Sequence, residues 1–297
     1  MLQQLGTLTY RAVFISDVHL GLRESRADLL VDFLQQIWCE RLYLVGDIVD
    51  GWRLRRSWYW NAAHDLFVRA VLKMAQAGVD IIYIPGNHDE ALRDWLGVEI
   101  AGIRVARRAE HRSAGGLRIL VTHGDEFDSA VRCAPSVAML GDCAYDIVVR
   151  LNYWLNAVRR RFGFAHWSLA QWTKQQLTAV MTVVRRYEDA LATEAGKLGF
   201  DGVVCGHIHC PGIRRIGRTL YMNDGDWVES CTALVEHFDG RFELLVWPHQ
   251  RPQLSRAVPP ALLPIAAGIR HAQQSLPHAD AAALLHRIAD AEAARGE

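Results

Sequence analysis

Residues 42–50 read LYLVGDIVD, an apolar run that ends in a cluster of polar residues. The same pattern recurs at residues 12–19, AVFISDVH, and at residues 81–89, IIYIPGNHD. Two later apolar runs, Ile119–Val121 and Val203–Cys205, also end in polar clusters. An apolar run of this length followed by polar residues is typical of a buried strand that leads into a loop. The pattern therefore predicts five strands, each followed by a polar loop.

The segments between the first three strands have helical periodicity, which predicts helices that cover a sheet. The apolar positions are Leu29, Leu30, Phe33, Leu34 and Ile37 in the first segment and Leu66, Ala70, Val71 and Met74 in the second. After Cys205 the pattern changes to short β-like pieces. These are Gly212–Ile216, Thr219–Met222, Cys231–His237 and Phe242–Trp247, with a turn at Asp239-Gly240. We therefore expect an α/β protein in which these later strands form a second sheet, packed on the first.

The composition is that of an ordinary globular protein. The chain has 297 residues, 51% of them hydrophobic, so it can bury a large core. Lys plus Arg and Asp plus Glu each number 33, a balance that removes any global electrostatic argument for nucleic acid as a partner. Residues 1–11 lack the features of a secretory signal, and no apolar run reaches the roughly 20 residues of a spanning helix. We expect a soluble, cytoplasmic protein whose cysteines are reduced.

The polar clusters contain the side chains that bind metals in proteins. They are Asp17-Val18-His19, Gly46-Asp47, Gly86-Asn87-His88-Asp89, His123-Gly124-Asp125 and Gly206-His207-Ile208-His209. In open α/β sheets functional groups collect beyond the carboxyl ends of the strands, so loops far apart in the sequence can meet there. Oxygen and imidazole ligands suit manganese, zinc or iron, and two such ions that share a carboxylate suit in-line attack at phosphorus. The ions would lower the pKa of a shared water from ~15.7 towards neutrality, so no Ser or Cys nucleophile is required.

Each of these residues has a simpler interpretation when it is taken alone. Asp and Asn are common in turns at strand ends, and a histidine beside a turn, such as His88, can hydrogen-bond the backbone. Cys205 and Cys210 flank the last cluster and suggest a structural zinc site, but packing explains them more simply. We interpret the remaining histidines, including His64, His111, His166 and His237, as surface or satisfied residues. The ordered set at five strand ends favours the metal site.

In this order, the five clusters resemble the complete signature of the calcineurin-like metallophosphoesterases. The resemblance implies a two-sheet β-sandwich flanked by helices. It also implies a hydrolase with two divalent metal ions, and we expect manganese, with zinc or iron as alternatives. It also implies the ligands of each ion. One ion is expected on Asp17, His19 and His209, the other on Asn87, His123 and His207, with Asp47 as the bridge between them.

The resemblance also implies roles for residues beside the ligands. His88 is expected to contact the phosphoryl oxygens of the substrate or to protonate the leaving group. Asp50 and Asp89 are expected to orient their neighbours. Trp52 and Asp125 are further candidates for contact with the substrate. Trp52 follows the cluster that contains Asp47, and Asp125 belongs to the cluster that contains His123.

Within the superfamily the chain is similar to the UDP-2,3-diacylglucosamine diphosphatase branch, which acts in lipid A synthesis. The similarity rests on the G-D-x-x-D-x-W segment at residues 46–52, a helical insertion after His123-Gly124-Asp125 and the G-D-W segment at residues 225–227. It implies a phosphate-containing substrate, either small or linked to a lipid. The alternatives are an enzyme for nucleotides or other small phosphoesters and a metal-binding scaffold without turnover. The chain differs from the branch at His88, where the branch carries arginine.

The insertion and the end of the chain have their own predictions. We expect one metallophosphoesterase domain at residues 1–250 that contains a helical hairpin or lid at residues 129–200. Residues 251–297 are expected to form a peripheral helical or partly disordered tail. Around the turn of the hairpin, residues 159–167 combine three arginines with aromatic residues, which suits contact with an anionic membrane surface. An equal alternative is that the hairpin packs on the main domain.

Overall fold

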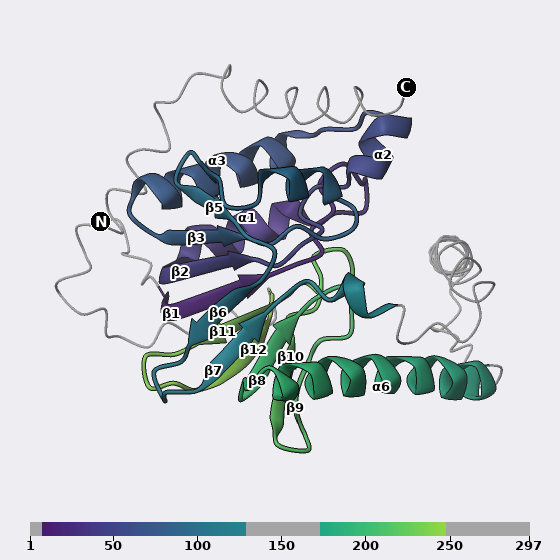
Figure 1. Cartoon of the computed structure of the whole chain (residues 1–297). Helices are drawn as coiled ribbons and strands as arrows, with labels where there is room; N and C mark the ends of the chain where they lie inside the picture. Colours follow the sequence, from purple (N-terminus) through teal and green to yellow (C-terminus); the bar gives the residue numbers. More distant parts are fainter. Residues whose placement is uncertain (1–7, 129–172, 248–297) are drawn as a thin grey trace, which may run out of the picture. The chain divides into compact units, whose positions relative to one another are not determined.

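The computed structural model describes residues 8–128 and 173–247 (Figure 1). The chain divides into two compact units, one made of residues 1–125 and 192–297 and the other of residues 126–191. Most of the predicted hairpin and the whole predicted tail lie outside the described residues. The described part of the hairpin is α6, a helix that spans Thr173–Lys197. No helix within the described residues is long and apolar enough to cross a membrane.

The first sheet of the larger unit has seven strands in the order β12-β11-β1-β2-β3-β5-β4. Three of the predicted strands, β1 (Leu8–Ile15), β2 (Ile37–Leu44) and β3 (Asp80–Tyr83), lie parallel at its centre. The remaining strands are β4 (Glu99–Ile100), β5 (Ile103–Val105), β11 (Thr232–Glu236) and β12 (Phe242–Val246). The parallel centre brings the carboxyl ends of β1, β2 and β3 to one edge.

The second sheet has five strands in the order β6-β7-β8-β10-β9. They are β6 (Ala109–Arg112), β7 (Arg118–Val121), β8 (Gly202–Cys205), β9 (Gly212–Ile216) and β10 (Thr219–Asn223). The prediction that the strands after Cys205 belong to this second sheet is confirmed for β9 and β10 and wrong for β11 and β12. β7 and β8 lie at its centre, whereas β11 and β12 join the first sheet antiparallel to β1. Every residue of β11 is buried, which suits a strand with neighbours on both sides and not a strand at a sheet edge.

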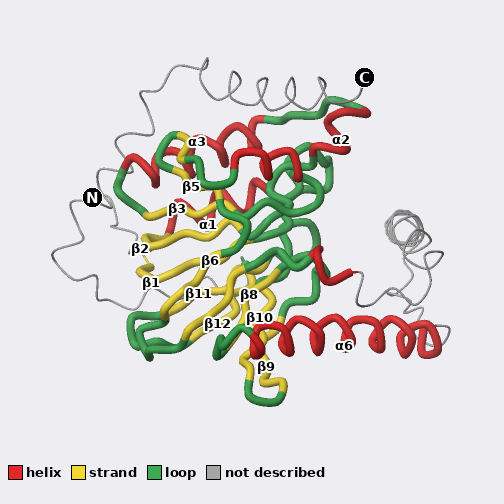
Figure 2. Tube along the Cα trace, viewed as in Figure 1, coloured by secondary structure: helices red, strands yellow, loops and turns green. Residues whose placement is uncertain are grey.

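Alternating side chains of the central strands build two separate cores. Val13 and Ile15 of β1 point into a core that also holds the buried face of α1 (Ala27–Gln36) and of α3 (Ala62–Gln76). Ala12 and Phe14 point the other way, into a core shared with residues of the second sheet such as Val121 and Met222. The helices therefore cover one face of the seven-stranded sheet, and the five-stranded sheet covers the other (Figure 2). This confirms the predicted two-sheet α/β sandwich flanked by helices.

Candidate metal centre

The predicted ligands lie in loops that leave the carboxyl ends of parallel strands. Asp17 follows β1, Asp47 follows β2, and residues 86–89 follow β3. His123 follows β7 and the pair His207 and His209 follows β8 in the second sheet. Main-chain hydrogen bonds tie the first two loops together, because Asp17 N donates to Gly46 O at 3.0 Å and His19 N donates to Asp47 O at 2.9 Å.

Five of the seven predicted ligands have a left-handed backbone. Their φ angles are 51° at Asp17, 49° at His19, 53° at Asp47, 68° at His207 and 50° at His209. Residues other than glycine seldom adopt this conformation, although Asp and His tolerate it better than most. Each such residue costs on the order of 1–3 kcal/mol, and residues of this kind concentrate at functional sites. The loops are therefore shaped to present side chains, not merely to reverse the chain.

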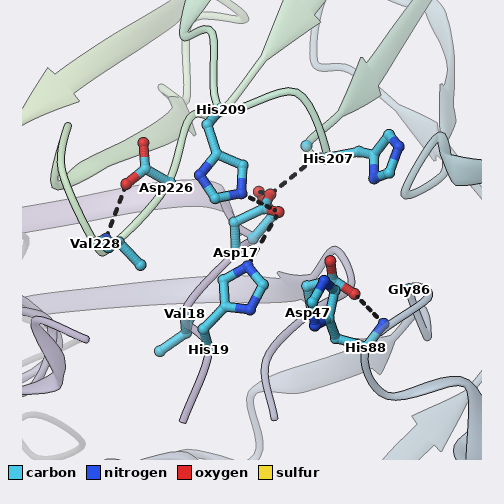
Figure 3. A network of polar contacts seen from close by, with 12 residues as sticks. Asp17, Val18, His19, Asp47, Gly86, His88, His207, His209, Asp226 and Val228 are labelled. Atoms are coloured by element: carbon cyan, nitrogen blue, oxygen red, sulfur yellow. Dashed lines mark hydrogen bonds and ion pairs between the residues drawn. The ribbon is translucent and has the colours of Figure 1, made fainter. Parts of the chain in front are cut away.

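The first group of potential ligand atoms comes from Asp17, His19 and His209, and these atoms all lie within 4.8 Å of one another (Figure 3). Asp17 Oδ1 lies 3.0 Å from His209 Nε2 and 3.9 Å from His19 Nε2. The other oxygen, Asp17 Oδ2, accepts a hydrogen bond from His207 N at 2.9 Å. Asp17 Oδ1 accepts no hydrogen bond from the described part of the chain, so it is the oxygen left for a cation.

The second group comes from Asp47, His123 and His207. Asp47 Oδ2 lies 3.2 Å from His123 Nε2. The other ring nitrogen, His123 Nδ1, lies 2.8 Å from Val45 O and donates its proton there. A backbone carbonyl that accepts a hydrogen bond from Nδ1–H commonly fixes the tautomer of a ligand histidine, so that Nε2 is free for a metal. Asp47 Oδ1 accepts from His88 N at 2.8 Å, which orients the carboxylate (Figure 3).

A third group, His19, Asp47 and His88, overlaps with the other two. Asp47 thus shares one group with His19 and another with His123, as a carboxylate between two ions would. The seventh predicted ligand, Asn87, has a buried Oδ1 without a hydrogen-bond partner in residues 8–128 and 173–247. The geometry therefore brings all the predicted ligand loops together.

The site fits divalent cations by two independent observations. Three buried atoms of the predicted ligands, Asp17 Oδ1, Asn87 Oδ1 and His123 Nε2, have no hydrogen-bond partner among the residues described. Leaving such atoms unpaired is costly unless a ligand satisfies them. In addition, a Cβ at Gly86 would collide with Asp47 Oδ1 and His123 Nε2, so the backbone approaches the ligand atoms as closely as glycine allows.

The carboxylates and imidazoles of the site strongly perturb each other. Burial raises the pKa of the Asp17 carboxyl, but the neighbouring His209 outweighs burial and lowers this pKa to about 2. Burial lowers the pKa of His209, whereas Asp17 raises it to about 9. Asp47 likewise holds the pKa of the buried His123 well above its usual range. The carboxylates therefore create a site that favours positive charge.

Asp50 connects the first group to His88. Its Oδ2 lies 3.3 Å from His19 Nδ1 and 3.2 Å from His88 Nδ1. Its Oδ1 accepts from Arg53 N at 2.8 Å and caps α2 (Gly51–Arg56), which fixes the carboxylate. Burial raises the pKa of Asp50, but contacts with His19 and His88 hold it well below its usual range. Asp50 is thus placed to orient both imidazoles.

His88 lies at the open side of the site. Its side chain is 25% exposed, and the ring of Trp52, itself 43% exposed, lies 4.3 Å away between ring centroids. Burial lowers the pKa of His88, but Asp50 and Asp47 outweigh it and raise the pKa above its ordinary value. His88 is therefore an imidazole whose protonated form the neighbouring carboxylates favour, and Trp52 covers it on one side.

The other two sequence candidates face away from the ligand groups. Asp89 is buried and accepts hydrogen bonds from Gly86 N at 2.6 Å, Ile48 N at 2.8 Å and Tyr83 Oη at 2.5 Å. It therefore joins two ligand loops. Asp125 Oδ2 lies 2.6 Å from an Arg93 guanidinium nitrogen, in an ion pair. Neither carboxylate belongs to a metal-binding group within the described residues.

A sixth polar loop, Asp224-Gly225-Asp226-Trp227, follows Asn223 at the end of β10; its G-D-W segment entered the resemblance, but its contact with the ligand loops was not predicted. Asn223 Nδ2 donates to Gly206 O at 2.7 Å, and Trp227 N donates to Asp17 O at 3.0 Å. Asn223 and this loop therefore support the two loops that carry Asp17 and His209. Its signal was present in the sequence, since the apolar run before Asn223 ends in polar residues like the other five.

Comparisons with known proteins agree with this site. A sequence model described as "Calcineurin-like phosphoesterase" matches residues 10–211, the part of the chain that holds every predicted ligand. A UDP-2,3-diacylglucosamine hydrolase of Xanthomonas campestris is 27% identical over 247 residues, which cover 77% of this chain and 96% of that protein. A protein of the same name from Porphyromonas gingivalis is 31% identical over 120 residues, 38% of this chain and 45% of that protein.

Solved structures with weak similarity were found as well. An archaeal phosphodiesterase matches with a TM-score of 0.37 and 14% identity, over 79% of this chain and 98% of that one. The Escherichia coli phosphoesterase Yfce matches with a TM-score of 0.37 and 15% identity, over 79% of this chain and 98% of that one.

Proposed function

Because the chain belongs to the calcineurin-like phosphoesterase family and is a metal-dependent phosphoester hydrolase, we propose that it uses two divalent ions to cleave a diphosphate or phosphoester bond. One observation carries the proposal. Asp47 shares one group of potential ligand atoms with His19 and another with His123 and His207, and buried atoms of the proposed ligands accept or donate no hydrogen bond in the described structure. Two ions around one shared carboxylate suit displacement at phosphorus.

The proposed ligands follow the two groups. Asp17, His19 and His209 would hold one ion, Asn87, His123 and His207 would hold the other, and Asp47 would bridge them. When bound, the ions would polarise phosphoryl oxygens and lower the pKa of water. Ligands of this type suit manganese, which we propose as the ion, with zinc and iron as alternatives.

His88 is proposed as the residue that acts on the substrate. His88 Nδ1 faces Asp50 Oδ2 at 3.2 Å, so Nε2 is the nitrogen proposed to meet the substrate. The raised pKa of His88 keeps a proton available for a phosphoryl oxygen or for the leaving group. Trp52 covers the ring and limits the access of water on that side.

We propose a UDP-2,3-diacylglucosamine-type diphosphate as the substrate. The support is the relative from Xanthomonas campestris, which is named UDP-2,3-diacylglucosamine hydrolase and aligns over 96% of its own length. Nucleotides and other small phosphoesters are the alternative substrates. They share the phosphoryl group that the site recognises and differ in the groups attached to it.

A product analysis tests both the chemistry and the substrate. Purified protein is stripped with a chelator, reloaded with manganese and incubated with a UDP-linked acylated sugar, with nucleotides and with a simple phosphodiester, and mass spectrometry identifies the products. We expect no turnover after chelation and formation of UMP from the acylated UDP-sugar after reloading. Full activity in chelated protein would refute the metal mechanism. Turnover of nucleotides alone would refute the proposed substrate, whereas the proposed metal mechanism would stand.

Contact with an anionic membrane is proposed for access to a lipid-linked substrate. The arginine and aromatic residues at 159–167 lie outside the described residues, but α2 and its following segment present Trp52, 43% exposed, and Trp58, 53% exposed. Each Lys or Arg near an anionic surface contributes about 1 kcal/mol, and salt weakens the effect. We expect co-sedimentation with anionic vesicles at low salt that is reduced when Arg159, Arg160 and Arg161 are replaced by Ser. A parent protein that ignores such vesicles would refute membrane contact.

A further inference from the structure

The sixth loop, residues 224–227, reaches the metal centre through one side chain, Asp224. Asp224 is fully buried, and its Oδ1 lies 2.6 Å from Ser16 Oγ. Ser16 Oγ in turn contacts Asp17 Oδ2, and it lies 3.1 Å from Gly225 O. A continuous chain of short contacts therefore runs from Asp224 through Ser16 to Asp17, the first predicted ligand in the sequence.

This chain acts on one of the two oxygens of Asp17. Asp17 Oδ2 contacts the Ser16 hydroxyl and also accepts from His207 N at 2.9 Å. Asp17 Oδ1 has neither contact and lies 3.0 Å from His209 Nε2. The two donors on Oδ2 prevent the carboxylate from rotating, so Oδ1 stays directed at the first group of ligands.

The single proton of the Ser16 hydroxyl limits how the two short contacts can be hydrogen bonds. A serine hydroxyl has one proton, so Ser16 can donate to only one of the two carboxylates. Both short contacts are hydrogen bonds if Asp224 carries a proton, donates it to Ser16 Oγ and leaves the Ser16 proton for Asp17 Oδ2. Burial and the nearby Asp17 raise the pKa of Asp224 well above its usual value, which agrees with this direction.

Close packing shields the chain of contacts from bulk solvent. A Cβ at Gly206 would collide with Ser16 Oγ and Asp17 Oδ2, so the backbone of the loop with His207 rests directly on these atoms. Ser16 and Asp17 are 1% and 0% exposed. The contacts of Ser16 with Asp17 and Asp224 are therefore made in the protein interior.

We propose that Asp224 is a positioning residue of the metal centre, which acts through Ser16 to hold Asp17 Oδ2 and so leaves Oδ1 for the first ion. The inference rests on the proposed function, because it takes Asp17 as a ligand. It assigns a purpose to a buried carboxylate that is not itself a ligand.

Manganese affinity, measured by isothermal titration calorimetry on the full chain, tests the proposal. Partners that orient metal ligands typically contribute about 10–100-fold to affinity. We expect Ser16→Ala and Asp224→Ala each to weaken the tighter manganese site by about 10–100-fold. Asp224→Asn, whose amide can still donate to Ser16, should retain an affinity within about 3-fold of the parent. Asp224→Leu, which fills the site but offers no hydrogen bond to Ser16, should bind manganese as weakly as Asp224→Ala, whereas a side chain that merely filled space could be replaced by Leu without this loss.

A double-mutant cycle makes the test specific. Because both side chains act through one link, Ser16→Ala/Asp224→Ala should bind manganese no more weakly than the weaker single variant. Additive losses would overturn the proposal, as would an Asp224→Asn variant as weak as Asp224→Ala. If Asp224→Ala does not fold, unchanged affinity in Ser16→Ala alone would overturn it, because that variant removes the same link.

Two controls separate this proposal from the one on which it rests. Asp17→Ala should abolish the tighter site, and if it binds manganese like the parent, the ligand assignment itself fails. If Asp17→Ala abolishes that site while Ser16→Ala and Asp224→Ala leave it unchanged, only the role of Asp224 fails. Glu236→Gln, which alters another buried carboxylate away from the ligands, should leave manganese affinity unchanged.

Discussion

Two clusters of buried Asp, Glu and His side chains occur in the larger unit, and they differ in how their polar atoms are satisfied. The ligand cluster holds the metal-binding groups at the strand ends. The inter-sheet cluster consists of Arg11, Tyr43, His111 and Glu236 and lies between the two sheets. Both are rich in the residue types that bind metals and catalyse reactions, so composition does not tell them apart.

In the inter-sheet cluster every polar group has a partner. His111 Nε2 lies 2.7 Å from Glu236 Oε2, and His111 Nδ1 lies 3.2 Å from Tyr43 Oη. The carboxylate of Glu236 also accepts from Arg11 at 2.7 Å and from Ala114 N at 2.7 Å. Such a network joins the sheets and leaves no atom for a ligand.

In the ligand cluster, by contrast, atoms of Asp17, Asn87 and His123 are buried without hydrogen-bond partners in the described structure. Asp17 also has a left-handed backbone, as do His19, Asp47, His207 and His209 of the ligand cluster, whereas none of the four residues of the inter-sheet cluster has one. Unsatisfied atoms on strained loops therefore mark the functional cluster, and satisfied atoms on regular strands mark the structural one.

The largest expected effect is the loss of the carboxylate between the two groups. Asp47→Ala should reduce the hydrolysis of a chromogenic phosphodiester by about 10³-fold or more, because metal assistance contributes several kcal/mol to the transition state. Elemental analysis should show that both ions are depleted. Retained activity in metal-free Asp47→Ala protein would show that the ligand cluster is another structural network.

His88→Ala tests the boundary of the ligand cluster. We expect kcat to fall by about 10²–10⁴-fold, the range of general acid–base assistance, while the metal content stays near that of the parent. His123→Ala is the matched control, since it should lose metal as well as activity. Loss of metal in the His88 variant would instead make His88 a ligand, as its grouping with His19 and Asp47 also permits.

Glu236→Gln tests the inter-sheet cluster in the opposite sense. Removing the charge leaves Arg11 and His111 without their anionic partner, which should lower the free energy of unfolding by about 2–3 kcal/mol. Urea denaturation measures this loss. Metal content and kcat of the folded variant should match those of the parent, and a fall in metal content would contradict the separation of the two clusters.

His64 is a third kind of buried histidine, with a smaller and pH-dependent effect. It is fully buried against Tyr59 and Trp60, and neither ring nitrogen has a hydrogen-bond partner in the described ranges. Burial lowers its pKa from 6.5 to about 4. Between these two pH values the unfolded chain binds more protons at this position than the folded protein does. The contribution of the neutral His64 ring to the free energy of unfolding is therefore fully present above pH 6.5 and is lost as the pH falls towards 4.

The free energy of unfolding of the parent should fall between pH 7 and pH 4.5, and replacement of His64 by Leu should make this fall smaller by about 1–2 kcal/mol. Urea denaturation of the parent and of His64→Leu at pH 7 and pH 4.5 measures the difference between them. Equal pH dependence in the two proteins would show that His64 is hydrated or protonated in the folded state.

The elements that the sequence predicted best are those whose signal lies in consecutive residues. The run Leu42–Val45 predicted a buried strand, and β2 ends within it. The piece Gly212–Ile216 coincides with β9. The placement of β11 was predicted wrongly, because the residues of a strand show that it is buried but not which strand it pairs with.

The candidate site shows the same limit. The sequence places Asp89 and Asp125 in the clusters with the ligands, yet the structure directs one to backbone donors and the other to Arg93. His111 was interpreted as a surface or satisfied residue, and it is satisfied in the core. The sequence shows the type of a side chain, whereas its direction depends on loops from other parts of the chain.

By itself, the sequence determined which residue types follow which strands, because apolar runs and the polar clusters after them are local patterns. It therefore contained the order of the five loops and the family to which the chain belongs. Only the tertiary structure decided which atoms remain unsatisfied, how Asp50 orients two imidazoles and how Asp224 reaches Asp17 through Ser16. Those contacts join residues up to 208 positions apart, and they exist only after the sheets have packed and brought the strand ends together.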